Sequence, residues 1–267
     1  MKFPILTSVI IFVIILSFAI KRSNRQMEQD SEAFFERERR ANTVRKKSLD
    51  NLNYIHIPPE ILAIDIENIC ADYFSKHELK EPEPSSDAAS CETPDLASIS
   101  ASCETPDQDS ISEEMQPSQE YLDFKEKEKN LHNSIQTLHT LSNEKIVNFT
   151  GISNTDLKLT YGTANISSLM EYDQNYTSLA MELQNLATLL IALDAEDAAI
   201  PVLEFAIATK SDISGTYKCL ATLYKKKNQP EKIEPLIQQA RDLPTVMSAS
   251  IVKYLEEISQ TEPSTDP

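Results

Sequence analysis

Apolar and polar positions follow three different patterns along the chain. Residues 3–20, from Phe3 to Ile20, form an apolar run without a charged side chain. From residue 121 onward, apolar side chains recur every three or four positions, which is the spacing of amphipathic helices. Between these parts, residues 76–118 hold few aromatic or β-branched side chains and cannot bury a core. The patterns predict an all-α protein with an apolar N-terminal helix, a disordered acidic linker and a helical C-terminal domain.

The apolar run has the length of a membrane-spanning helix. In a helix its residues rise about 27 Å, close to the ~30 Å thickness of a bilayer core. A cleavable signal peptide has a shorter apolar region and a small-x-small cleavage site, whereas Lys21 and Arg22 follow here at once. We therefore expect an uncleaved transmembrane anchor over residues 1–22. More Lys and Arg follow the run than precede it, which places the C-terminal part in the cytoplasm.

Basic side chains follow the apolar run in a predicted juxtamembrane helix, residues 23–50. Ser31 is placed to begin this helix because its hydroxyl can cap a first turn. Two interpretations stay open for the cations. They attract anionic lipid headgroups, or they lie on a solvated helix that leads away from the bilayer. The cations after Ser31 are Arg37, Arg39, Arg40, Arg45, Lys46 and Lys47.

Residues 51–75 form a short segment that we expect to be ordered. Residues 52–58 alternate between apolar and polar side chains and end at a Pro pair, which predicts a short strand or an extended segment. This piece either pairs with a partner or covers part of the helical domain. Residues 61–74 are apolar enough to form a short helix that packs on another surface.

The acidic linker, residues 76–118, contains a direct duplication. The sequence ASCETPDLASIS at 89–100 is followed at once by ASCETPDQDSIS at 101–112. The duplication supplies two copies of a docking peptide, or it is a neutral insertion into an unconstrained tether; the composition favours the second interpretation. Because like charges repel, we expect an extended spacer that holds the C-terminal domain away from the bilayer.

The helical domain, residues 119–258, contains a self-similarity at an offset of 34 residues. Leu186 corresponds to Leu220, Ala187 to Ala221 and Ala206 to Ala240. Each copy predicts a pair of amphipathic helices, and the copies cover residues 176–209 and 210–243. The predicted helices span residues 176–193, 197–209, 214–227 and 231–243.

This period and pattern resemble the tetratricopeptide repeat (TPR). The second copy carries its large-x-x-Leu-small-x-x-Tyr signature as Tyr217, Leu220, Ala221 and Tyr224. The resemblance implies a stack of helical hairpins, completed by helices at residues 121–141 and 245–258 and followed by a disordered tail at 259–267. It also implies a peptide-binding groove lined by the first helix of each hairpin. Carried over by position, the groove residues are Gln184, Thr188, Ile191, Lys218, Thr222, Lys225 and Lys226.

The predicted groove lacks one feature of the TPR family, and its lysines also allow a second interpretation. Gln184 and Thr188 stand where some members of the family carry a Lys–Asn clamp for C-terminal carboxylates, so we expect no such clamp. What remains is a general basic groove, or else a solvated face of lysines.

The net charge and the absence of known motifs argue against several classes of function. The net charge of −17 argues against nucleic-acid binding, which needs a basic footprint. The four cysteines show neither C-x-x-C nor zinc-knuckle spacing, and no phosphate loop, zincin motif or nucleophile elbow occurs. We therefore expect neither an enzyme nor a cofactor or metal site.

The sequence predicts a membrane-anchored scaffold or adaptor that presents a TPR-like module to a protein or peptide partner on the cytoplasmic side. Its second partner is the bilayer, through residues 3–20. An outward-facing structural protein of the cell envelope is the alternative, and an enzyme of unrecognised type is a remote one. The sequence does not identify the partner, because one fold serves many unrelated functions.

Overall fold

The computed structural model describes residues 3–79 and 118–260, with side chains from Phe12 onward at the N-terminal end. The prediction of an all-α protein is confirmed, since the described residues contain helices and no strand. The helices are α1 (Phe3–Asn42), α2 (Pro59–Leu62), α3 (Ile66–Lys76), α4 (Gln119–Ser142), α5 (Asn154–Tyr161), α6 (Ile166–Ala192), α7 (Glu196–Ala208), α8 (Ser214–Lys226), α9 (Ile233–Arg241) and α10 (Ser248–Gln260), with short 3-10 helices η1 (Thr163–Asn165) and η2 (Pro230–Lys232).

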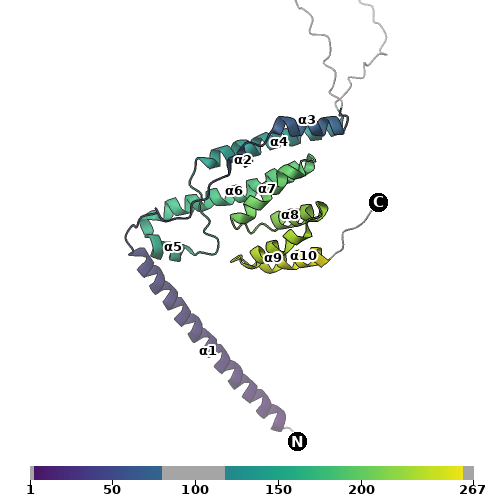
Figure 1. The fold of residues 1–267 in the computed structure, drawn as a ribbon. Coiled ribbons are helices and arrows are strands. Elements are labelled where there is room, and N and C mark those ends of the chain that lie inside the picture. Colours follow the sequence, from purple (N-terminus) through teal and green to yellow (C-terminus); the bar gives the residue numbers. More distant parts are fainter. Residues whose placement is uncertain (1–2, 80–117, 261–267) are drawn as a thin grey trace, which may run out of the picture.

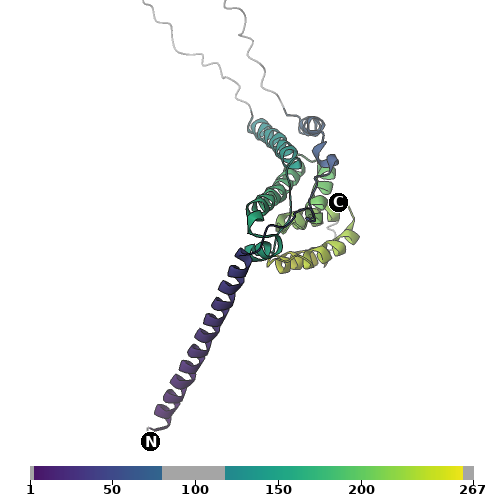
Figure 2. The ribbon, with the colours of Figure 1, turned by 90° about the vertical axis from the view of Figure 1, so that its left-hand side faces the viewer.

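Helix α1 is continuous over 40 residues and projects away from the other helices (Figures 1 and 2). Ser31 lies within this helix, so the prediction that Ser31 begins a separate helix is wrong. The reason is local, because neither Gly nor Pro interrupts residues 5–42. Among the described side chains, no helix is both long and apolar enough to cross a membrane. Residues 3–11 of the predicted span lie outside these described side chains.

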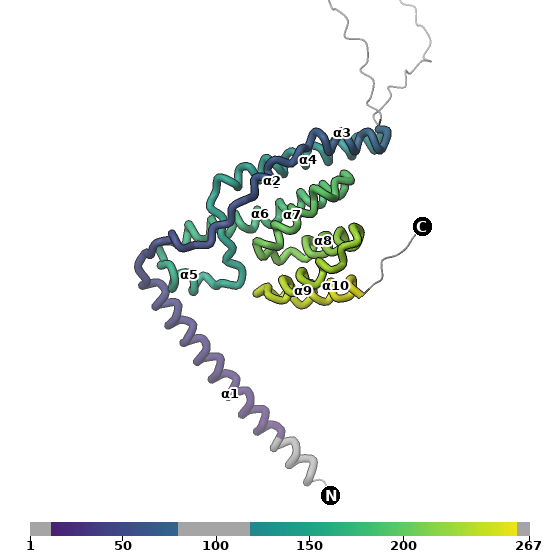
Figure 3. The backbone as a smooth tube through the Cα atoms, viewed as in Figure 1, coloured from purple at the N-terminus to yellow at the C-terminus, as the bar shows by residue number. Residues whose placement is uncertain are grey.

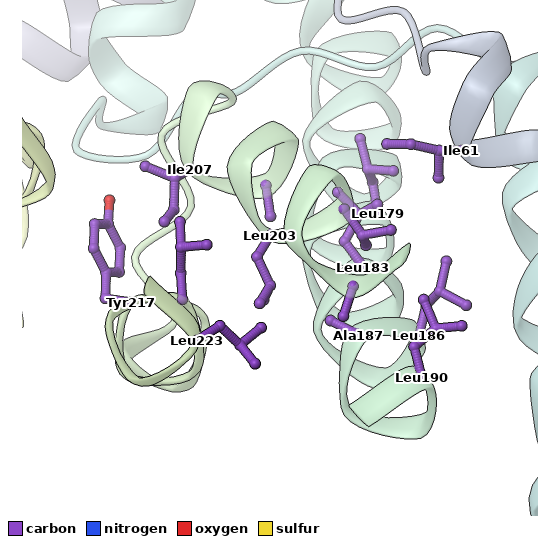
Figure 4. Packing of buried hydrophobic residues seen from close by; sticks show 14 of the residues in the cluster. Ile61, Leu179, Leu183, Leu186, Ala187, Leu190, Leu203, Ile207, Tyr217 and Leu223 are labelled. Atoms are coloured by element: carbon purple, nitrogen blue, oxygen red, sulfur yellow. The ribbon is translucent and has the colours of Figure 1, made fainter. Parts of the chain in front are cut away.

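The other long helices pack as successive hairpins. Helix α7 lies against α6 and α8, α10 lies against α8 and α9, and α4 runs along α6. Figure 4 shows Leu203 of α7 between the leucines of α6 and Tyr217 of α8, all in one buried cluster. Ala187 and Ala221 are fully buried, and their small side chains let neighbouring helices approach closely. The hairpins α6–α7 and α8–α9 fall on the two sequence copies, although α6 begins at Ile166 rather than near residue 176.

Residues 52–79 pack on this hairpin stack, beside α4 (Figure 3). Ile57 and Ile61 are buried in the same apolar cluster as Leu131 of α4 and Leu179 of α6. The backbone N–H of Ile55 donates to the carbonyl oxygen of Ile146 at 2.9 Å. Of the two interpretations of residues 52–58, the structure shows the one in which the segment covers the helical domain.

Aromatic packing connects the helices before and after residues 80–117, called the acidic segment from here on. The rings of Tyr73 and Phe124 stack with centroids 5.6 Å apart, and Phe74 contacts Tyr121 edge to face. Helix α3 before the segment and helix α4 after it therefore belong to one packed unit. The expectation that this segment separates the domain from an anchor is wrong, because residues 52–79 already lie on the domain. The predicted disorder and duplication at 80–117, and the tail from 261 onward, lie outside the described residues.

Candidate binding groove

A polar hollow lies between α4 and α6. Residues three or four apart share a helix face, and each of these helices carries a row of polar side chains beside its buried leucines. The two rows face each other across a cavity of about 450 Å³. The lining residues are Asn130, Asn133, Ser134 and Thr137 of α4 with Glu182, Asn185, Thr188 and Leu189 of α6.

Gln184, a predicted groove residue, connects α6 to α8. Its side-chain oxygen accepts a hydrogen bond from the buried hydroxyl of Thr216 at 2.7 Å. Its amide nitrogen lies 3.2 Å from the Thr188 hydroxyl and 3.8 Å from the Cys219 sulfur. Gly215 lies beside this arrangement, and a Cβ there would stand 3.2 Å from the Gln184 amide nitrogen, a tight contact that a small shift of this side chain relieves. The side chain of Gln184 is therefore engaged within the fold, between α6 and α8.

The other predicted residues of α6 differ in exposure. Thr188 is exposed and lines the hollow, and its hydroxyl donates to the backbone oxygen of Gln184 at 2.8 Å. Ile191 is half-buried and packs against the apolar core. Thr188 is thus the predicted α6 residue best placed to meet a ligand.

The predicted residues of α8 point to two different neighbours. The Lys218 ammonium lies 5.1 Å from the centre of the Tyr254 ring on α10, and Lys225 donates to the backbone oxygen of Ile258 at 3.4 Å. Lys226 instead forms an ion pair with Glu196 of α7, and the hydrogen bond with this carboxylate raises the pKa of Lys226. The three lysines therefore do not form one basic strip.

Separate contacts nevertheless link neighbouring helices. Gln184 contacts Thr188 in the hollow and lies near Cys219 of α8, while Lys218 of α8 lies over the Tyr254 ring of α10. Thr222 is exposed on α8, one turn after Lys218, and its hydroxyl donates to the Lys218 backbone oxygen at 2.9 Å. The exposed polar side chains of α4, α6 and α8 together, Asn133, Thr188 and Thr222 among them, make up the polar face.

This face offers both donors and acceptors. An Asn side chain carries an N–H donor and a carbonyl acceptor, and a hydroxyl supplies either. Each residue of a polypeptide backbone presents one of each, apart from proline, which lacks the donor. Facing rows of amides and hydroxyls therefore match an extended peptide better than they match an apolar ligand.

The α4 side of this groove was not predicted from the sequence. Residues 121–141 were expected only to cap the hairpin stack, so Asn130, Asn133 and Thr137 received no role. Their spacing was the available signal, since positions 130, 133 and 137 fall on one helix face directly beside the buried Leu131 and Leu138.

The described residues contain no group of three or more His, Cys, Asp or Glu side chains placed to hold a metal ion. His132 and His139 are both exposed on α4, and a ring nitrogen of His132 lies 3.0 Å from the backbone oxygen of Glu128. Burial raises the pKa of Cys70 to about 11, which keeps this thiol protonated. Comparisons with protein-family models, curated proteins and solved structures find no match to this chain.

Proposed function

We propose that the protein is a membrane-attached scaffold whose groove across α4, α6 and α8 binds an extended peptide segment of a protein partner. The observation that carries the proposal is the pair of facing polar rows on α4 and α6, with Asn133 and Asn185 among them. Amides placed in this way exchange hydrogen bonds with a peptide backbone whatever its side chains. The partner's side chains then set specificity through contacts with α8 and α10.

The resemblance to the tetratricopeptide repeat supports the same face. It implies that the first helix of each hairpin lines the groove, and α6 and α8 are those helices. Thr188 of α6 lines the hollow, and Lys218 of α8 lies over the Tyr254 ring, so both helices contribute to this face.

Membrane attachment is proposed through α1. Its described apolar side chains are exposed in the isolated helix, with Phe12 at 64%, Ile14 at 62% and Phe18 at 71%. Moving such a side chain out of water stabilises it by about 1.5–3 kcal/mol. A lipid bilayer supplies that apolar surrounding for the whole circumference of the helix, whereas a protein surface covers one side only.

Three asparagines support a cytoplasmic position for the domain. Asn148, Asn165 and Asn175 each begin an N-x-Ser/Thr acceptor sequence for N-linked glycans. In the fold their amide nitrogens donate to the backbone oxygens of Thr209 at 3.0 Å, Lys47 at 2.7 Å and Lys145 at 3.1 Å, respectively. A glycan takes the place of one N–H hydrogen and adds bulk beside the accepting carbonyl, so the fold fits a compartment without glycosylation.

The test uses peptides selected from a random-sequence library on the immobilised full-length protein in detergent. The variant Asn133→Ala with Asn185→Ala is compared with Asn51→Ala with Asn68→Ala, which removes two exposed asparagines outside the groove. Two lost hydrogen bonds of about 0.5–1.5 kcal/mol each predict a Kd weaker by about fivefold to a hundredfold. Equal affinity of both double variants for the selected peptides contradicts the proposal.

A further inference from the structure

We propose that α1 is a rigid stalk that holds the groove at a fixed height and orientation above the bilayer. The inference rests on the membrane attachment proposed above and goes beyond it, because it assigns the spacing function to α1 and removes it from the acidic segment. Two sets of contacts support the proposal. One set joins the C-terminal end of α1 to the domain, and the other fixes the two ends of the acidic segment to the same domain.

Side chains near the end of α1 are joined to α5. Arg37 forms an ion pair with Asp156, and Glu38 forms one with Lys158. The Thr155 hydroxyl also donates to the Glu38 carboxylate, at 2.7 Å. Only 26% of the Glu38 side chain and 21% of the Lys158 side chain is exposed, so water screens this pair less than a typical surface pair.

The backbone just after α1 is held as well. The N–H of Lys47 donates to the Tyr161 carbonyl at 3.0 Å, and the Asn165 amide donates to the carbonyls of Lys47 at 2.7 Å and Tyr161 at 2.8 Å. Ala41, on the last turn of α1, is fully buried. Because the chain is fixed on both sides of the helix end, we infer that α1 does not rotate freely relative to the domain.

Gly162 makes this close approach possible. It has a φ of +87°, a conformation that suits glycine. A Cβ at this position would collide with the carbonyl carbon and oxygen of Arg45, so the two backbones are in direct contact here. The path of the chain after α1 therefore depends on a residue 117 positions later in the sequence.

The length of the stalk follows from helix geometry. Beyond the apolar run, α1 continues from Lys21 to Asn42, and at 1.5 Å per residue this part is about 33 Å long. Figure 1 shows α5 beside the C-terminal end of α1, with α3 and α4 on the opposite side of the helical domain. The distance from the membrane to the groove beside α4 is therefore greater than the length of the stalk.

The acidic segment has no part in this spacing. Its preceding residue, Leu79, packs against the apolar core, and Ser118 caps α4, which packs on α6. Both ends are attached to the same body, so the length of the segment between them does not set the distance from α1 to the groove.

The experiment places a dye at Gln136→Cys, an exposed position on α4, and acceptor lipids in vesicles that carry the full-length protein. Cys91, Cys103 and Cys219 are replaced by Ser so that labelling is specific. One variant lacks residues 23–33, which shortens the helix by about 17 Å and by three turns, so that the helix face is nearly preserved. A matched variant lacks residues 89–112 of the acidic segment.

We expect energy transfer to rise strongly when 23–33 are removed and to stay unchanged when 89–112 are removed. The reverse pattern, or equal transfer in all three proteins, overturns the stalk. Vesicle flotation is scored separately: a full-length protein that does not float with lipid contradicts the membrane attachment and the stalk together. Peptide binding has no influence on either readout, so a failure of the groove proposal is recognised on its own.

Discussion

Lys158 on α5 forms an ion pair with Glu38 on α1, across 119 intervening positions of the chain. The pair, with the Thr155 hydroxyl, keeps the pKa of Glu38 below its usual value, and the hydrogen bond to Lys158 is the largest cause. The contact lies where the C-terminal end of α1 meets the domain. The strength of this connection therefore depends on the protonation of the Glu38 carboxylate.

The first prediction is a pH dependence of this connection. A depressed pKa in the folded state means that the ion pair stabilises the fold above the pKa of Glu38 in the unfolded chain. That contribution is lost as the pH falls through the lower folded-state value. Denaturant unfolding of the wild type and of Glu38→Gln should therefore differ most near pH 7 and converge in acid. A difference that stays constant with pH contradicts this role.

The second prediction concerns Gly162→Ala. The positive φ and the collision with the Arg45 backbone should cost about 1–3 kcal/mol in the free energy of unfolding. Gly215→Ala is the matched control, since its φ is ordinary and its nearest neighbour is the Gln184 side chain. We expect the control to change stability by less than about 1 kcal/mol, because Ala also favours the helix. Chemical denaturation of both variants measures the comparison.

The third prediction is a gain in stability from Tyr217→Phe. The hydroxyl of Tyr217 is buried without a hydrogen-bond partner among the described residues, and burial raises the pKa of Tyr217 to about 12. Removing an unsatisfied hydroxyl should stabilise the protein by about 1 kcal/mol. Tyr176→Phe, which loses a bond to the Thr209 carbonyl at 3.3 Å, should instead lose about as much. Thermal unfolding that lowers Tm equally for both contradicts the assignment.

The fourth prediction concerns glycosylation. Expressed in a cell that glycosylates secretory proteins, the native chain should keep its gel mobility after endoglycosidase treatment. A version directed into the secretory lumen by a signal peptide should be modified at Asn148, Asn165 or Asn175 and fold poorly, because these amides hold backbone carbonyls in the fold. A mobility shift of the native chain would place the domain on the opposite side of the membrane.

The periodicity of apolar residues was sufficient for the helical hairpins. Leu183, Leu186 and Leu190 recur at helical spacing, and the leucines that the pattern placed on the inner face are buried. Periodicity reports which face of a helix is buried, and it does not report what covers that face. For this reason the copies at 176–209 and 210–243 could be located from sequence, while their neighbours could not.

The parts that sequence did not predict depend on contacts between distant positions. Ile55 pairs with Ile146, and Tyr73 stacks on Phe124, but neither segment carries a local signal for its partner. The apolar side chains of residues 61–74 indicate that this segment packs against another element. The sequence pattern does not identify α4 as that element. The continuity of α1 was missed for a different reason, since a good capping residue at Ser31 was given more weight than the absence of a helix breaker.

The candidate groove was predicted in part for the same reason. Thr188 was located because it belongs to a repeat, and Asn133 was missed because α4 lies outside the repeats. The lysines of α8 were assigned to one strip on position alone. Their ion pair and ring contact, made with α7 and α10, depend on how far each side chain reaches.

The packing of Tyr73 on Phe124 also bears on proteolysis. A protease that cut the backbone between Leu79 and Ser118 would produce an anchor-bearing fragment and a groove-bearing fragment. In a simple tether that cut releases the groove from the membrane. In this fold the fragments stay together. Ile57 and Ile61 remain buried in the core, the α3 aromatics remain packed on α4, and Glu38 remains paired with Lys158. Cleavage in the acidic segment is therefore not a means of shedding the domain.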